Sequence, residues 1–114
     1  MDNAVEIKSF AFAVRIVNLC KYLQAEKKEY VLSKQILRCG TSIGANVAEA
    51  QHAQSKADFA AKLNIALKET GETKYWLRLL HETDYCTDQE FASIFNDCVE
   101  LEKLLVTIVK TTVS

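Results

Sequence analysis

The sequence predicts an all-α protein folded as an antiparallel up-down-up-down four-helix bundle. Its 114 residues include no proline and 3 glycines, and 49% of them are hydrophobic. This composition suits long helices joined by short turns. Hydrophobic residues also recur at steps of three and four along four long stretches, which is the period of an amphipathic helix. The length fits a single domain, residues 1–114, whose core needs no metal or disulfide.

The first predicted helix covers about residues 4–26 and carries apolar side chains on two nearly opposite faces. One face consists of Ile7, Phe10, Val14 and Val17. The other face consists of Phe12, Ile16, Leu19 and Leu23. One bundle core cannot bury both faces, so we expect one to pack inside the subunit and one against a neighbouring subunit. We assign the second face to the oligomer interface; the alternative is a helix buried deep in its own bundle.

The second predicted helix, about residues 31–53, combines an apolar stripe with small residues and a polar border. The stripe consists of Ile36, Gly40, Ile43, Val47 and Ala50. Gly40, Gly44 and Ala48 recur at every fourth position and would let another helix approach closely. Ser42, Asn46 and Glu49 border this stripe, and Asn46 can hydrogen-bond a facing helix. We expect these glycines, small residues and polar residues to fix the packing and register of the helix.

The third and fourth predicted helices, about residues 56–82 and 88–111, each begin with a capping box. Ser55 precedes Asp58 by three positions, and Thr87 precedes Glu90 by three. The seam of the third helix consists of Phe59, Leu63, Ala66, Thr70, Thr73, Leu77 and Leu80. The seam of the fourth consists of Phe91, Ile94, Cys98, Leu101, Leu105 and Ile108.

An antiparallel turn near residue 54 sets the register of the second and third helices. This register places Arg38 near the level of Glu69 and Glu49 near that of Lys62. Glu69 and Glu72 could form an acid–base pair if one carboxyl had a raised pKa. We favour ion pairs for these acids, because basic partners are close at hand.

One motif has the spacing of a metal site. Glu49 and His52 form Glu-x-x-His, which di-iron bundles use twice. The second copy is missing, because Arg78 stands three residues before His81. The sequence also contains no nucleophile–base constellation and no glycine-rich phosphate loop. It therefore predicts no catalytic residue, no metal site, no cofactor and no small-molecule substrate, and an enzyme is the least favoured alternative.

The charge pattern argues against nucleic-acid binding by a single subunit. The formal net charge is −1, and no basic cluster is interleaved with aromatic residues. Several subunits could still combine their cations into one positive surface. The candidate nucleic-acid contacts are Lys8, Arg15, Lys21, Lys34 and Arg38.

The sequence predicts a cytoplasmic protein without a membrane partner. The first residues, Met1-Asp2-Asn3, do not form a basic stretch leading into an apolar segment. No apolar run is long enough to span a bilayer. The four cysteines lie far apart without a C-x-x-C pair, which is typical of reduced thiols. These cysteines are Cys20, Cys39, Cys86 and Cys98.

Four segments together resemble a known family. They are Ser42 to Ala50, Ser55 to Phe59, Leu63 to Leu67, and Glu72 to Leu77. They resemble the four-helix-bundle proteins encoded in intervening sequences of bacterial 23S rRNA genes. The resemblance implies a short bacterial bundle that assembles into a homo-oligomeric ring, a pentamer. A related branch is the accessory variability determinant of diversity-generating retroelements, a ring that binds nucleic acid and its reverse transcriptase.

The chain departs from this family where a basic surface would be expected. Many relatives have glycine in place of Ala50 and basic residues after it, whereas this chain continues Gln51-His52-Ala53-Gln54. We therefore expect a non-enzymatic scaffold or adaptor whose partner is a second copy of itself. The alternative is an accessory factor that binds RNA, DNA or a reverse transcriptase.

Overall fold

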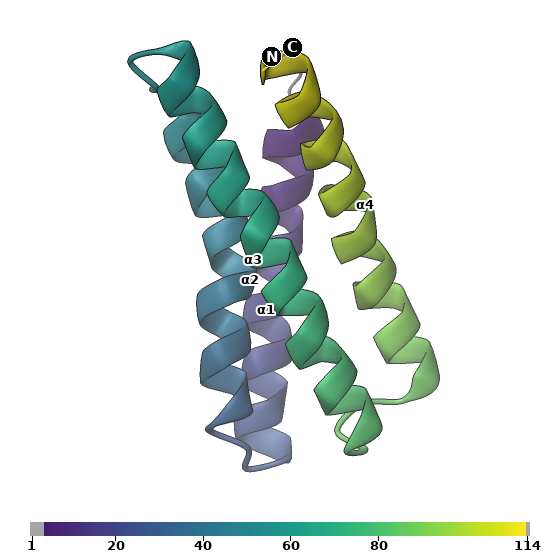
Figure 1. The fold of residues 1–114 in the computed structure, drawn as a ribbon. Helices are drawn as coiled ribbons and strands as arrows, with labels where there is room; N and C mark the ends of the chain where they lie inside the picture. Colours follow the sequence, from purple (N-terminus) through teal and green to yellow (C-terminus); the bar gives the residue numbers. More distant parts are fainter. Residues whose placement is uncertain (1–3, 114) are drawn as a thin grey trace.

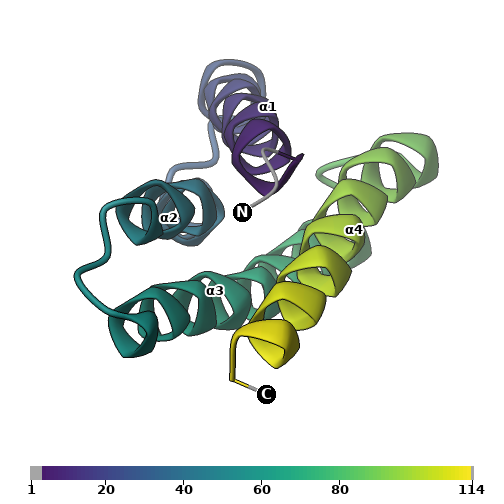
Figure 2. The same cartoon turned by 90° about the horizontal axis from the view of Figure 1, so that it is seen from above.

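The computed structural model describes residues 4–113, which form four helices: α1 (Ala4–Glu26), α2 (Leu32–Ala50), α3 (Lys56–Glu82) and α4 (Asp88–Val113). Successive helices run in opposite directions, and α1 begins at the end of the molecule where α4 finishes (Figure 1). Seen from above, the four helices are arranged around a common centre (Figure 2), and their buried hydrophobic residues form one core. The predicted all-α, up-down-up-down bundle is therefore confirmed.

The starts of α3 and α4 follow the capping signals in the sequence. Ser55 Oγ accepts a hydrogen bond from the backbone N–H of Asp58 at 3.0 Å. The N–H of Thr87 donates to Glu90 Oε1 at 2.8 Å, and the N–H of Glu90 donates to Thr87 Oγ1 at 3.1 Å. Both capping boxes thus satisfy amide groups that have no partner within their helix. α1 and α3 occupy the predicted ranges, and α4 continues to Val113.

α2 is shorter than the predicted residues 31–53, because it begins at Leu32 and ends at Ala50. The N–H groups of Gln51, His52 and Ala53 donate to carbonyl groups three residues earlier. This pattern tightens the chain into a 3₁₀-like turn and ends the α-helix.

A buried carboxylate starts α2. The Glu29 side chain accepts hydrogen bonds from the backbone N–H groups of Val31, Leu32 and Ser33 at 3.0, 2.9 and 2.7 Å. Burial alone raises the pKa of Glu29, but these donors and the Ser33 side chain outweigh burial, so the pKa is lowered. Glu29 therefore stabilises the N-terminal end of α2, where negative charge is favoured.

The core consists largely of the predicted stripes. All five stripe residues of α2 are buried. α3 contributes the buried residues Leu63, Ala66, Thr70, Thr73, Leu77 and Leu80. α4 contributes the buried residues Ile94, Cys98, Leu101 and Leu105. Phe59, Phe91 and Ile108, at the ends of the predicted seams, are partly buried against this core.

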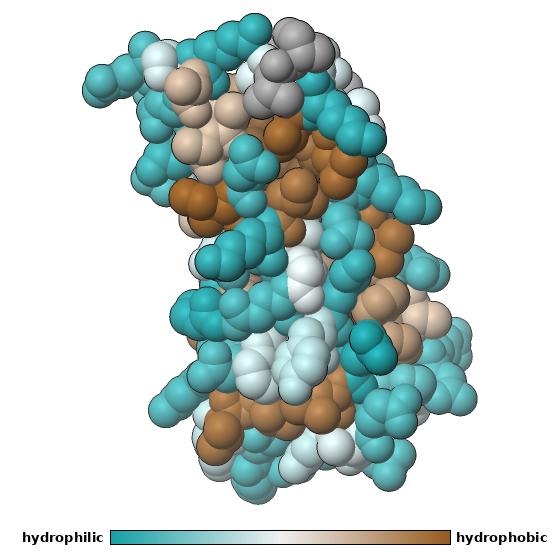
Figure 3. Space-filling model, in the orientation of Figure 1, coloured by the Kyte–Doolittle hydropathy of each residue, from teal (hydrophilic) through white to brown (hydrophobic). Residues whose placement is uncertain are grey.

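The surface mixes polar and apolar residues. On the face seen in Figure 3, hydrophobic side chains gather over the upper part between α3 and α4, with polar side chains around them. Within residues 4–113, no helix combines the length and the apolar character needed to cross a membrane.

The seam between α1 and α4 is the loosest of the four seams between neighbouring helices. Two ion pairs cross it. Lys8 pairs with Glu100, and Arg15 Nη1 lies 2.6 Å from Asp97 Oδ2. All four side chains are about half exposed, so solvent screens each pair and it adds little to stability. Polar bridges rather than close apolar packing thus connect the rims of α1 and α4.

Candidate functional site

The structure buries the face of α1 that was assigned to the oligomer interface. Phe12, Ile16 and Leu23 are buried inside the subunit's own core, and Leu19 is partly buried against it. Phe12, Ile16 and Leu23 are therefore not available to a neighbouring subunit, and their assignment to the interface was wrong. The physical reason is the length of this face. It continues through Val5, Ser9 and Cys20, which are also buried, so it can pack against the other helices along nearly all of α1.

The other face of α1 is the exposed one. Ile7 is 66% exposed, Phe10 72% and Val14 46%. Their spacing of three and four residues gives one stripe along the first half of the helix. We call Ile7, Phe10 and Val14 the outer stripe of α1. A contiguous apolar stripe on a surface is a candidate contact for another protein.

The small residues of α2 allow α1 to approach closely. A Cβ atom on Gly40 would lie 2.8 Å from Cγ1 of Ile16, and one on Gly44 would lie 3.1 Å from the carbonyl oxygen of Ser9. Ala48, one turn beyond Gly44, is exposed. The close-packing seam therefore covers Gly40 and Gly44.

The polar residues beside this seam bond mostly within their own helix. Ser42 Oγ donates to the carbonyl of Arg38 at 2.6 Å, and Asn46 Nδ2 donates to the carbonyl of Ser42 at 2.8 Å. Asn46 is thus satisfied by α2 itself, whereas the sequence suggested a facing helix. Glu49 does reach α3, where Lys62 Nζ lies 3.8 Å from its Oε1.

The predicted ion pair between Arg38 and α3 is present and extends to two carboxylates. Arg38 pairs with Glu72, and its Nη1 lies 3.8 Å from Glu69 Oε2. Trp76 Nε1 donates to Glu72 Oε2 at 3.0 Å. This hydrogen bond is the main cause of the lowered pKa of Glu72, and Arg38 adds to it. Glu72 is thus stabilised as a carboxylate, which suits an ion pair and not a general acid.

Glu69 is less well satisfied than Glu72. Its Oε2 atom is buried and has no hydrogen-bond partner within the described part of the chain. The positive charge near Glu69 Oε2 is the guanidinium of Arg38. Glu69 therefore depends on Arg38 for electrostatic compensation, because a buried carboxylate without a counter-charge is costly.

Three of the five candidate nucleic-acid contacts are already paired with carboxylates. Lys8 and Arg15 bind acids of α4, and Arg38 binds acids of α3. Lys21 and Lys34 are exposed and form no ion pair within residues 4–113. The structure therefore brings together no free positive surface from these five residues in one subunit.

The two histidines lie apart and in different settings. His52 is exposed in the turn after α2. His81 Nε2 lies 2.6 Å from Asp88 Oδ1, and its ring stacks on Phe91 with centroids 4.3 Å apart. No group of three or more metal-ligating side chains is found among the described residues.

A cleft lies between α1 and α4, and the sequence analysis did not predict it. The volume of this cleft is about 510 Å³, which lies in the range of small-molecule pockets. Its floor is apolar and its rim is polar. The lining residues are Arg15, Asn18, Leu19, Tyr22, Leu77, Leu80, Cys86, Gln89, Glu90, Ser93 and Ile94. We call this the α1–α4 cleft.

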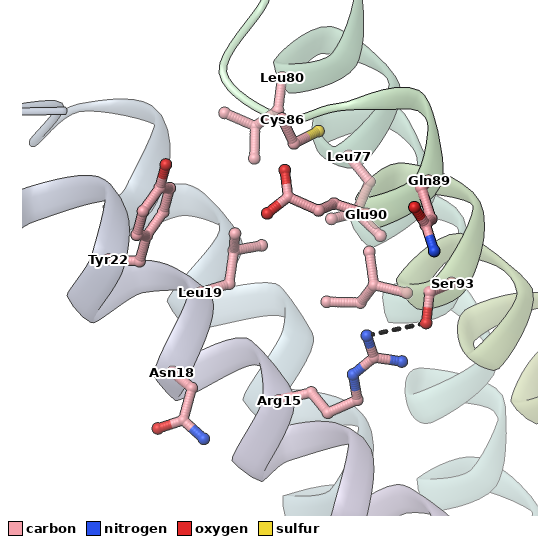
Figure 4. A pocket seen from close by; sticks show the side chains of 11 residues that line it. Arg15, Asn18, Leu19, Tyr22, Leu77, Leu80, Cys86, Gln89, Glu90 and Ser93 are labelled. Atoms are coloured by element: carbon pink, nitrogen blue, oxygen red, sulfur yellow. Dashed lines mark hydrogen bonds between the residues drawn. The ribbon is translucent and has the colours of Figure 1, made fainter. Parts of the chain in front are cut away.

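Side chains from both rims meet over the cleft (Figure 4). Arg15 reaches from α1 to α4, where its Nη2 donates to Ser93 Oγ at 3.1 Å. The Glu90 carboxylate points from α4 toward Leu19 and Tyr22 of α1. In the sequence, the only signal of this arrangement was that Arg15 and Leu19 share one side of α1.

Comparison with known proteins agrees with this architecture. The sequence model of a family described as 23S rRNA-intervening sequence protein matches residues 1–107. A crystal structure of a protein of unknown function, from the S23 ribosomal protein family of Bacteroides thetaiotaomicron VPI-5482, is 62% identical in sequence. The alignment covers 96% of this chain and 97% of that one, with a TM-score of 0.94. No curated protein matches the sequence.

Proposed function

Because the chain belongs to the family of 23S rRNA-intervening sequence proteins, we propose that it is a non-enzymatic scaffold or adaptor that assembles with copies of itself. The assembly is a ring of subunits in the cytoplasm, a pentamer in its simplest form. The observation that carries this proposal is the outer stripe of α1, which is apolar and exposed in the single chain.

The outer stripe has the features of a helix-packing surface. Its three side chains are large and stand at steps of three and four residues, the pattern by which helices bury an apolar face. Phe10 is the most exposed of them, and exposed aromatic side chains are common anchors of protein interfaces. Ala48 on α2 is exposed and small, so a neighbouring helix would meet only a methyl group there.

The test is the molar mass in solution. Multi-angle light scattering and sedimentation velocity on the purified chain at micromolar concentration should give a mass several times that of one chain. A single species of 12.8 kDa at that concentration would remove the proposal.

An accessory factor that binds nucleic acid is the second candidate. The family description and the name of the similar structure both refer to ribosomal components, and Lys21 and Lys34 are exposed. It ranks second because the other candidate cations are paired. Titration of the intact assembly with RNA and DNA at low ionic strength tests it, since binding through phosphates weakens steeply with salt.

A further inference from the structure

The α1–α4 cleft has the shape and lining of a small-ligand site. Leu19 of α1, Leu77 and Leu80 of α3, and Ile94 of α4 form its apolar floor. Three helices therefore contribute to one concave surface. Such a floor accepts a hydrocarbon or aromatic body, while the polar rim selects the charge of the ligand.

Of the two charged residues that line the cleft, the acidic one has no ionic partner within 4 Å among the described residues, whereas the basic one is paired. The guanidinium of Arg15 is occupied by Asp97 at 2.6 Å and by Ser93 at 3.1 Å. The carboxylate of Glu90 accepts one N–H, from Thr87, through Oε1. The Thr87 side chain also hydrogen-bonds to this carboxylate, and the Glu90 side chain is exposed at the rim of the cleft. A carboxylate can accept several hydrogen bonds, so Glu90 retains capacity for a cationic donor.

An ammonium group of the chain itself already lies beside this carboxylate. Lys27 Nζ lies 6.0 Å from the centre of the Tyr22 ring. The charge of Lys27 also contributes to the lowered pKa of Glu90, after the larger contributions of the Thr87 hydrogen bonds. Lys27 is exposed and anchored by no ion pair in the described chain. The end of the cleft near Tyr22 is thus compatible with an ammonium group, as carboxylates and aromatic faces are in general.

We infer that the α1–α4 cleft binds a small amphipathic amine. The apolar body of the ligand lies on Leu19, Leu80 and Ile94, and its ammonium group pairs with Glu90 beside the Tyr22 ring. Arg15 closes the opposite end of the cleft, where no carboxylate of the described chain contributes to the lining, so a reversed orientation leaves the ammonium group without a partner. This inference rests on other residues than self-association does, because none of the three outer-stripe residues lines the cleft.

The test compares three ligands of equal chain length on the intact protein: octylamine, 1-octanol and octanoate. Binding is followed by calorimetry and by amide chemical shifts. We expect octylamine to bind about tenfold more tightly than octanol, and octanoate most weakly, because only the amine forms a charge-assisted hydrogen bond with Glu90. The shifted amides should surround Leu19, Glu90 and Ile94.

The Glu90→Gln variant tests whether the negative charge of Glu90 is needed for binding while the fold stays intact. Glutamine preserves the capping box at the start of α4, so the thermal midpoint should change little, while the affinity for octylamine falls to that for octanol. Glu82→Gln, at the exposed end of α3, should leave all three affinities unchanged. Leu19→Asn should weaken octylamine and octanol alike.

Two results would overturn the inference. One is equal affinity of the wild-type protein for octylamine and octanol; the other is a preference for octylamine that survives Glu90→Gln. Light scattering on the same samples keeps the two proposals apart. A monomer that binds octylamine selectively would contradict only the assembly proposal. An oligomer without this selectivity would contradict only the cleft proposal.

Discussion

A Cβ atom on Gly40 would lie 2.8 Å from Cγ1 and 2.9 Å from Cγ2 of Ile16. Both atoms are close to the backbone of a β-branched side chain, which has little rotational freedom. α1 and α2 therefore approach as closely as they do because position 40 lacks a side chain.

Gly40→Ala should destabilise the protein, whereas Gly71→Ala should stabilise it. Overpacking against Ile16 costs about 1–3 kcal/mol, which exceeds the gain of about 1 kcal/mol in helix propensity. Nothing lies within 4 Å of a Cβ at Gly71, so there the propensity gain of about 1 kcal/mol remains. Urea unfolding of both variants measures the difference. If Gly40→Ala were as stable as Gly71→Ala, α1 would be free to shift and the close contact would not limit packing.

The lowered pKa of Glu29 predicts a loss of stability in acid. The carboxylate stabilises the fold fully above its ordinary pKa of 4.5, and this contribution is lost as the pH falls through the lowered pKa of the folded state. Glu29→Gln should cost about 1–2 kcal/mol at pH 7, because a charged cap of α2 is replaced by a neutral one. The deficit should shrink toward zero at the acid end of a series of urea titrations. A deficit that is constant with pH would mean that the charge of Glu29 plays no part.

The outer stripe of α1 predicts a variant that separates the subunits. Phe10→Asp should weaken self-association at least about tenfold, because it places a charge at an apolar anchor. Ile65→Asp is the matched control, since Ile65 is exposed but lies on α3. Sedimentation velocity over a concentration series measures both. Equal dissociation of the two variants would place the interface elsewhere.

The four cysteines should differ sharply in reactivity. Burial raises the pKa of Cys98 to about 12 and that of Cys20 to about 11, and it also raises the pKa of Cys39. Thiolates are the reactive form, so these buried thiols should be inert at pH 8. Burial and the nearby Glu90 and Asp88 carboxylates raise the pKa of Cys86 as well, but this thiol is only partly buried and lines the α1–α4 cleft, where a reagent can reach it. Ellman's reagent should therefore modify one thiol in the native protein, and Cys86→Ser should abolish that reaction. A second fast thiol would indicate that the core opens readily.

Most of the fold could be predicted because the helices are long and their patterns are local. The seams of α2, α3 and α4 follow directly from residue spacing, and the register between α2 and α3 gave the pairs Arg38–Glu69 and Glu49–Lys62. The face of α1 could not be chosen in this way, because both of its faces are apolar. The choice depends on how well each face fits the other helices, and Ile16 and Ser9 fit the glycines of α2.

The candidate site was harder to predict because its parts come from distant positions. The capping role of Glu29 was missed for a different, local reason: Glu29 stands in a run of charged residues, which usually indicates a solvated turn, although its amide partners lie only two to four residues ahead. The α1–α4 cleft depends on the distance between two helices that are joined only through the rest of the bundle. Residue spacing within α1 or α4 carries no information about that distance.

The looseness of the seam between α1 and α4 also determines where the bundle opens first. α2 is held on one side by glycine contacts with α1 and on the other by ion pairs and buried residues of α3. The seam between α1 and α4, in contrast, is bridged by exposed ion pairs over a hollow. We therefore expect breathing motions to separate α4 from α1 most easily, and backbone amides of α4 should exchange with deuterium before those of α2. Equal exchange in the two helices would mean that the hollow does not govern where the bundle opens.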